Sequence, residues 1–120
     1  MGADGRQQAG RMGETLALRY LVREGYVPLA RNYRTPRGEI DLIVRRGATL
    51  VFVEVKLRRG MGFGEPLEAI TPRKQSRIRA AAEQFLAGLP EGSFEEVRFD
   101  AIGVTFEGGR PRVTHLEDAF

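Results

Sequence analysis

Two carboxylates and an amine lie close together in a pair of apolar segments of the sequence. Asp41 belongs to the segment GEIDLI at residues 38–43, and Glu54 and Lys56 belong to VFVEVK at residues 51–56. Burying such groups in apolar strands is costly unless they are paired or used for chemistry. Carboxylates suit Mg²⁺ or Mn²⁺, and a bound cation activates water and polarises a phosphate. These residues therefore predict a site for metal-dependent phosphodiester hydrolysis.

The two segments are expected to form antiparallel strands at residues 38–45 and 49–57, joined by a turn centred on Gly47 and Ala48. This turn makes the numbers of facing residues sum to 95, so that Asp41 faces Glu54 and both share one face of the sheet. Facing Cβ atoms are about 5 Å apart, which suits two carboxylates that share one cation. A slip of one residue in this register would separate them.

Other residues are candidates for the same site. The ammonium of Lys56 is expected to orient or deprotonate the attacking water, or to stabilise the transition state. The backbone carbonyl of Val55 is a candidate ligand, and Glu14 could bind the metal directly or through water. Two alternatives remain: Glu14 could complement a helix dipole, and Glu39 could face Lys56 as an ion pair on a hydrophilic strand face.

The remaining chain reads as two helices and further strands. Apolar spacing predicts a helix from about residue 11 to 24, which Gly25 can terminate. A second helix is expected at 72–87, with Thr71 as its N-cap. Strands are expected at 97–106 and 113–116.

One aspartate interrupts the first of these C-terminal strands. Asp100 lies between Phe99 and Ala101. It is either a further site residue or the partner of a core-facing arginine.

Charge is spread unevenly along the chain and favours a polyanionic partner. Residues 1–80 carry a balance of +8 and residues 81–120 a balance of −5, which gives the net charge of +3. A basic face favours nucleic acid, although a solvated arginine-rich surface is the alternative. Residues 31–37 are expected to form a basic loop around Pro36, whose aromatic ring at Tyr33 could stack on a base. The candidate nucleic-acid-binding residues are Arg31, Tyr33, Arg34, Arg37, Arg58, Arg59, Arg73, Lys74 and Arg77.

Composition excludes several other classes of site. The chain has no cysteine and a single histidine, so thiolate zinc sites, disulfides and cysteine nucleophiles are ruled out. Its 120 residues predict a flexible tail at 1–10 and one domain at 11–120. No apolar run approaches the roughly 20 residues of a membrane span, and residues 1–10 lack the apolar core of a signal peptide. A cytoplasmic protein is expected.

At these motifs the chain resembles the PD-(D/E)xK, or restriction-endonuclease-like, nuclease superfamily. The segments 38–41, 52–56 and 98–100 and the terminal Ala119-Phe120 are similar to those of the bacterial YraN family. That family is in turn similar to archaeal Holliday-junction resolvases. The match extends from Gly13 over essentially the whole chain and includes Asn32 and Lys74.

The resemblance implies an α/β fold with an α-β-β-β-α-β core, in which helices flank a mixed central sheet. It also implies that Asp41 and Glu54 bind Mg²⁺ or Mn²⁺, that Lys56 is the catalytic lysine, and that Glu14 is the acidic residue of the first helix. Ile40 replaces the proline that usually precedes the motif aspartate. Resolvases act as symmetric dimers on four-way junctions, so DNA is the implied substrate and a homodimer is one implied assembly. The alternatives are a nucleic-acid-binding protein that does not cut efficiently, and an interaction module of DNA-processing machinery.

Overall fold

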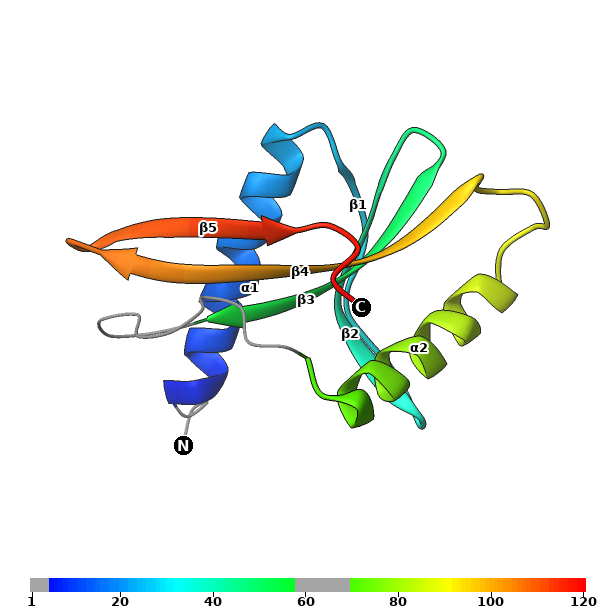
Figure 1. The fold of residues 1–120 in the computed structure, drawn as a ribbon, viewed down its shortest axis with the longest axis horizontal. Coiled ribbons are helices and arrows are strands. Elements are labelled where there is room, and N and C mark those ends of the chain that lie inside the picture. Colours follow the sequence, from blue (N-terminus) through cyan, green and yellow to red (C-terminus); the bar gives the residue numbers. More distant parts are fainter. Residues whose placement is uncertain (1–4, 58–69) are drawn as a thin grey trace.

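A five-stranded sheet with one helix packed on each face forms the fold (Figure 1). The structure is a computed structural model and describes residues 5–57 and 70–120. Its elements, in chain order, are α1 (Gly5–Arg23), β1 (Val27–Thr35), β2 (Gly38–Arg46), β3 (Thr49–Leu57), α2 (Pro72–Ala87), β4 (Glu96–Glu107) and β5 (Arg110–Leu116). The α/β class and the α-β-β-β-α-β order are confirmed, and the further strand expected at 113–116 is present as β5.

The sheet is mixed, as the resemblance implied. Its strands lie in the order β1-β2-β3-β4-β5, and only the β3–β4 pair is parallel. A parallel pair needs a long crossover connection, and α2 lies within it. The central strand β3 is covered on both faces, which agrees with its nearly continuous run of apolar residues.

The register of the β2–β3 hairpin is the predicted one. Its pairs run from Arg46 opposite Thr49 to Leu42 opposite Val53, so the residue numbers of each pair sum to 95. The turn between the strands needs a left-handed residue, which Gly47 supplies with φ of 60°. The predicted turn and register are therefore confirmed as far as Leu42.

Two apolar clusters hold the layers together. On one face, Ala17 and Leu21 of α1 pack against Val51 and Val53 of β3. On the other face, α2 packs on the sheet through Ile78, Ala81 and Ala82, with Phe52 of β3 fully buried beneath it. None of the helices in the described residues is both long enough and apolar enough to cross a membrane.

The caps of α2 agree with the sequence prediction. The Thr71 hydroxyl accepts a hydrogen bond from the backbone N–H of Lys74 at 3.2 Å, and Pro72 occupies the first helical position. Gly88 caps the other end of the helix, where its N–H bonds back to Phe85 and Leu86 carbonyls. These local signals fix the first turn of α2, where two of the candidate basic residues lie.

The structure corrects two predicted boundaries. The first helix begins at Gly5 rather than near Arg11, so residues 5–10 belong to α1, while 1–4 lie outside the described residues. The expected loop at 31–37 is largely strand, because β1 continues to Thr35 and only Pro36 and Arg37 form the turn. An edge strand tolerates Pro28, and a bulge between Pro28 and Ala30 absorbs the irregularity.

Candidate functional site

The side chains of β2 change faces next to Asp41. Leu42 and Val44 lie in the cluster under α1, whereas Ile43 and Ile40 lie in the cluster under α2. Regular alternation would place Ile40 on the same face as Leu42. Asp41 is therefore located where the strand reverses its faces, and the regular alternation expected from the sequence is wrong at this point.

The neighbouring strand β1 changes faces at the same place. Arg31 bonds to α1, whereas Tyr33 packs edge-on against Phe85 of α2. Between them, Asn32 has φ of 53°, a left-handed conformation that asparagine adopts more readily than most residues. Arg31 pairs with Leu42 and Tyr33 with Ile40, so Asn32 lies across from Asp41 in β2.

Asp41 bridges the gap that opens between β2 and β3. Its Oδ2 atom accepts a hydrogen bond of 2.8 Å from the backbone N–H of Val55, beyond the last paired residues of the hairpin. Burial and the nearby Glu54 carboxylate raise the pKa of Asp41 to about 8, although the Val55 hydrogen bond opposes this shift. The half-buried Asp41 and the buried Glu54 thus both lie at this opening. The predicted facing pair of these two residues is not part of the ladder, which ends at Leu42 and Val53.

Glu54 is the more deeply buried of the two acids, with 4% of its surface exposed. Its Oε2 atom lies 2.5 Å from Nζ of Lys74, whose side chain is half exposed. Burial alone would lower the pKa of Lys74, but the hydrogen bond to Glu54 and the charges of the surrounding carboxylates together outweigh burial and raise it. A lysine of α2, rather than Lys56 of the same strand, therefore neutralises this carboxylate.

A glycine contact brings α2 close to these carboxylates. A Cβ atom on Gly38 would lie 2.0 Å from the carbonyl oxygen of Arg77, so only glycine fits at the start of β2. Three residues of α2, Lys74, Arg77 and Ile78, line the same cavity as the carboxylates. The missing side chain at Gly38 therefore sets the distance between helix and site.

Glu14 reaches the site from α1, but its carboxylate is already engaged. Its Oε1 atom accepts hydrogen bonds from Asn32 at 3.0 Å and from Arg31 at 3.4 Å. Arg31 also donates to the Thr15 hydroxyl and to the backbone carbonyl of Arg11. Glu14 thus holds the reversal point of β1 against α1, while its side chain faces the cavity that contains Asp41.

The cavity at the reversal point has a volume of about 270 Å³. Its lining includes Glu14, Glu39, Asp41 and Glu54, and a neighbouring hollow extends it to Asn32 and Arg34. In the described part of the chain, no three Asp, Glu, His or Cys side chains are close enough together to hold one metal ion. The candidate ligands at the opening are the carboxylates of Asp41 and Glu54, whose oxygens are of the kind that hard cations prefer, and Val55 also lines the cavity.

Lys56 is half-buried on β3 and does not line this cavity. Among residues 5–57 and 70–120, no ion pair joins Lys56 to Asp41, Glu54 or Glu39. The predicted Glu39–Lys56 pairing is wrong, because the ladder ends at Leu42 and the carboxylate of Glu39 instead lies 3.6 Å from Nε of Arg34.

The predicted nucleic-acid-binding residues differ in their surroundings. Lys74 and Arg77 line the site, Arg34 lines its extension, and Arg73 is exposed on the first turn of α2. Two others are held by the fold, Arg31 by α1 and Tyr33 against Phe85. Arg37 is exposed and lies 3.8 Å from the exposed Glu83. Arg58 and Arg59 lie outside the described residues.

Sequence reasoning missed the link between Lys74 and Glu54. A signal for it is present in the composition, because 17 of the 19 basic residues are arginine and only Lys56 and Lys74 are lysine. Lysine in so arginine-rich a chain suggests a position that needs a compact ammonium. Lys74 carries this signal as strongly as Lys56 does.

A larger groove of about 700 Å³ lies between α1 and β5, away from the carboxylates. Its lining is mostly apolar, with Leu16, Leu18 and Val22 on one wall and Val113 on the other, and contains no acidic side chain. A cation site needs the carboxylates that the lining of this groove lacks, so the smaller polar cavity is the candidate site.

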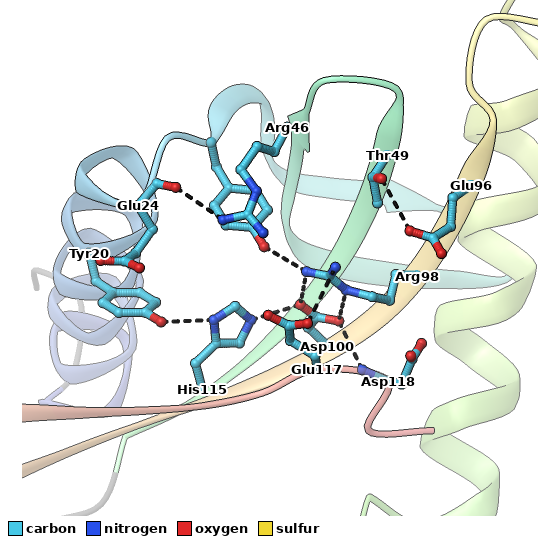
Figure 2. A network of polar contacts seen from close by, with 11 residues as sticks. Tyr20, Glu24, Arg46, Thr49, Glu96, Arg98, Asp100, His115, Glu117 and Asp118 are labelled. Atoms are coloured by element: carbon cyan, nitrogen blue, oxygen red, sulfur yellow. Dashed lines mark hydrogen bonds and ion pairs between the residues drawn. The ribbon is translucent and has the colours of Figure 1, made fainter.

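A second buried carboxylate, Asp100, belongs to a separate network (Figure 2). Arg98 donates two hydrogen bonds of 2.9 Å to it, His115 Nε2 lies 2.7 Å away, and the N–H of Asp118 donates at 3.1 Å. Burial alone would raise the pKa of Asp100, but the hydrogen bonds from His115 and Arg98 outweigh it and lower the pKa. The salt-bridge alternative for Asp100 is confirmed, because its carboxylate is fully buried and bonded.

This network ties the C-terminal strands to α1. His115 of β5 also contacts the Tyr20 hydroxyl of α1 at 2.9 Å through Nδ1, and Arg98 donates to the Tyr26 hydroxyl (Figure 2). Its members come from both ends of the chain and stabilise the face of the sheet opposite α2.

Comparison with known proteins identifies the family. A sequence model of the uncharacterised protein family UPF0102 matches residues 13–104. A UPF0102 protein of Anaeromyxobacter dehalogenans is 48% identical over 118 residues, which cover 98% of this chain and 87% of that protein. The UPF0102 protein of Syntrophomonas wolfei is 41% identical over 114 residues, covering 95% of this chain and 98% of that protein. A third, from Pelotomaculum thermopropionicum, is 47% identical over 121 residues, covering 98% and 99% of the two chains. The chain therefore belongs to the UPF0102 family, the YraN family that its motifs resemble.

Proposed function

We propose that this protein is a metal-dependent endonuclease that hydrolyses phosphodiester bonds in DNA, with branched DNA as its preferred substrate. The observation that carries the proposal is the convergence of Asp41 and Glu54 on one cavity where β2 and β3 separate. Partial burial and the charge of the neighbouring Glu54 make ionised Asp41 costly, as the raised pKa of Asp41 records. Carboxylates with strongly perturbed pKa values are concentrated at catalytic and cation-binding sites, which supports such a role for this pair.

The donor set fits a hard divalent cation such as Mg²⁺ or Mn²⁺. The carboxylates of Asp41 and Glu54 would hold this cation. The N–H of Val55 points toward Asp41 of β2. Because the N–H and C=O of a strand residue point to the same neighbouring strand, the Val55 carbonyl would face the same opening. When bound, the cation would lower the pKa of a water and polarise the scissile phosphate. The Val55 N–H fixes the Asp41 carboxylate through one oxygen and leaves the other for the cavity.

Basic residues around the opening would receive the phosphate backbone. Lys74 and Arg77 enter from α2, and Arg34 lies at the extension of the cavity beside β1. Lys56, two residues beyond Glu54 on β3, would orient the attacking water or neutralise charge in the transition state. Glu14 would act through Asn32 and Arg31, by holding the reversal point that aims Asp41.

The test is a cleavage assay with Mg²⁺ and with Mn²⁺ on labelled four-way junction, flap, duplex and single-stranded DNA. The wild-type protein would run beside Asp41→Asn, Glu54→Gln and Lys56→Ala, with Glu83→Gln as an exposed-carboxylate control. We expect cation-dependent cutting, strongest on the junction, that is lost in the three site variants and kept in the control. Cutting that persists in Asp41→Asn and Glu54→Gln would contradict the proposal.

Light scattering of the protein with and without junction DNA tests the homodimer that a symmetric substrate calls for.

A second candidate function is DNA binding without efficient cleavage. Two observations favour it: Glu54 is already paired with Lys74, and within residues 5–57 and 70–120 no third acidic, histidine or cysteine side chain joins the two carboxylates closely enough to hold a metal ion. Salt-dependent binding to junctions, with no cutting and no loss of affinity in Asp41→Asn or Glu54→Gln, would support this function over the first.

A further inference from the structure

The ion pair between Lys74 and Glu54 joins a fixed group to a movable one. Glu54 belongs to the central strand β3 and is almost entirely buried, so its carboxylate has little freedom. Lys74 extends from the first turn of α2, and half of its side chain is exposed. Its long flexible stem can leave the carboxylate for solvent, whereas Glu54 cannot follow.

A buried carboxylate needs a positive partner whether or not a divalent cation is present. An ionised acid without a partner in this position would carry a large desolvation cost. Among the described residues, Lys74 is the cation found within 4 Å of Glu54. An ammonium held this closely on Oε2 and a divalent cation on the same carboxylate would repel each other, so the two positive charges compete for Glu54.

The backbone of Lys74 is fixed while its side chain is free to exchange. The N–H of Lys74 is held by the Thr71 hydroxyl, and the side-chain amide of Gln75 donates to the Ile70 carbonyl at 2.7 Å. The close approach of Arg77 to Gly38 holds this turn over the cavity. The helix therefore presents the ammonium to Glu54 without needing to move.

We propose that Lys74 is a resident counter-ion that competes with the divalent cation for Glu54. In the cation-free protein its ammonium is the positive partner of the buried Glu54 carboxylate. Cation binding displaces the ammonium to the mouth of the cavity, beside Arg77. This role rests on the proposed function, because it takes the cation site of that function as its starting point.

The presence of only two lysines in the chain allows a direct test on the wild-type protein. Protein carrying ¹³C at lysine Cε gives two side-chain NMR signals, and a Lys56→Arg variant leaves the Lys74 signal alone. We expect Mg²⁺ to shift the Lys74 signal along a saturating curve, because its ammonium loses a carboxylate partner. A Lys74 signal that stays in place while calorimetry records bound Mg²⁺ would overturn the proposal and leave the cation site intact.

A second measurement uses the affinity for Mn²⁺, read from the free-ion signal in electron paramagnetic resonance. Lys74→Met removes the charge and keeps the length of the stem, Lys74→Arg keeps the charge, and Ser76→Ala is an exposed control on the same helix. We expect Lys74→Met to bind Mn²⁺ about tenfold more tightly than wild type, which corresponds to removing one competing cation. Lys74→Arg and Ser76→Ala should stay within about threefold of wild type by the same reasoning.

The outcomes separate this inference from the proposed function. Equal or weaker Mn²⁺ affinity in Lys74→Met, with binding lost in Asp41→Asn, would overturn the role of Lys74 alone. Absence of Mn²⁺ binding in both wild type and Lys74→Met would overturn the cation site and the counter-ion together. Binding by Lys74→Met where wild type binds nothing would support the competition in its strongest form.

Discussion

The carboxylate of Asp41 accepts a hydrogen bond from the backbone N–H of Val55 at 2.8 Å, in the place where a ladder bond between β2 and β3 would otherwise stand. A side-chain oxygen of β2 thus takes the place of a backbone carbonyl of β2 as the hydrogen-bond acceptor for β3. This substitution requires the reversal of faces that β2 and β1 share at Asp41 and Asn32. The site is therefore a property of the sheet's irregularity and not of its regular alternation.

The raised pKa of Asp41 makes the stability of the cation-free protein depend on pH. Below the ordinary value of 3.8 both the folded and the unfolded chain hold this proton. Between about pH 4 and pH 8 the unfolded chain releases it while the folded chain keeps it, so the free energy of unfolding falls as pH rises. Asn at this position still accepts from Val55 but does not ionise. We expect Asp41→Asn to be more stable than wild type at pH 9 by about 1–3 kcal/mol, and equal to it near pH 4.

Urea unfolding in EDTA at pH 4, 6, 8 and 9 measures this dependence. Glu83→Gln, which removes an exposed carboxylate on α2, is the matched control and should follow the wild-type curve. Parallel stability curves for wild type and Asp41→Asn across this range would show that Asp41 ionises normally in the folded chain.

Asp100 is expected to have the opposite dependence on pH. Its pKa is lowered, so the stabilisation is complete above the ordinary value of 3.8 and is lost as pH falls below it through the folded value. Asp100→Asn leaves the largely buried Arg98 guanidinium with only the more distant carboxylate of Glu117, 3.5 Å away, among the described residues. We expect it to cost about 3–5 kcal/mol at pH 7, and less at pH 2.5, which lies below the ordinary pKa of 3.8 at which the unfolded acid takes up its proton.

Chemical denaturation at pH 7 and pH 2.5 checks this difference. Glu107→Gln breaks an exposed ion pair with Arg112 on the same hairpin and should change stability by less than about 0.5 kcal/mol. A small effect of Asp100→Asn at pH 7 would mean that the network in Figure 2 contributes little to the fold.

Gly38 is expected to be intolerant of any side chain. The added Cβ of alanine would meet the Arg77 carbonyl at 2.0 Å, and backbone atoms cannot rotate away as a side chain can. We expect Gly38→Ala to cost more than about 2 kcal/mol, because α2 must move off the sheet. Gly10→Ala, where nothing lies within 4 Å, is the matched control in α1 and should be neutral or stabilising by about 0.5–1 kcal/mol. Thermal denaturation compares the two, and similar melting temperatures would contradict the close contact.

The parts of the fold that could be predicted depend on short-range signals. Gly47 fixes the turn of the hairpin, and the spacing from this turn fixes the β2–β3 register as far as Leu42. Thr71 and Gly88 mark the ends of α2 through hydrogen bonds within a few residues. Each of these features follows from the conformational preference of one or two residues, which the sequence displays directly.

The parts that could not be predicted depend on contacts between distant segments. The reversal at Asn32 and Asp41 needs Glu14 and Arg31 to bind across α1 and β1, and a single strand's pattern does not reveal it. The partner of Glu54 is Lys74, twenty residues away, because the fit of α2 over Gly38 decides which amine arrives. The alternation of side chains along β3 pointed to Lys56 as the amine near Glu54, because that pattern contains no information about α2, which packs over the strand.

Two arginines of β1 are expected to have different roles, Arg31 in stabilising the fold and Arg34 in binding DNA. Arg31 donates to the Thr15 hydroxyl at 2.9 Å and to the Arg11 carbonyl at 3.0 Å, so it fastens β1 to α1. Arg34 is far more exposed, with only a long contact to Glu39, and lies beside the hollow next to Asp41. We expect Arg31→Ala to cost about 1–2 kcal/mol of stability through its lost hydrogen bonds. Arg34→Ala should change stability by less than about 0.5 kcal/mol but weaken binding to junction DNA.

Fluorescence anisotropy with labelled junction DNA at several salt concentrations, in Ca²⁺, measures the binding half of this prediction. If Arg34 contacts one phosphate, its loss should reduce the slope of log affinity against log salt by about 0.9. Arg31→Ala, measured at a temperature where it remains folded, should keep the wild-type slope, because its guanidinium is committed to α1. An unchanged slope in Arg34→Ala, or a reduced slope in Arg31→Ala, would place the path of the DNA elsewhere on the protein.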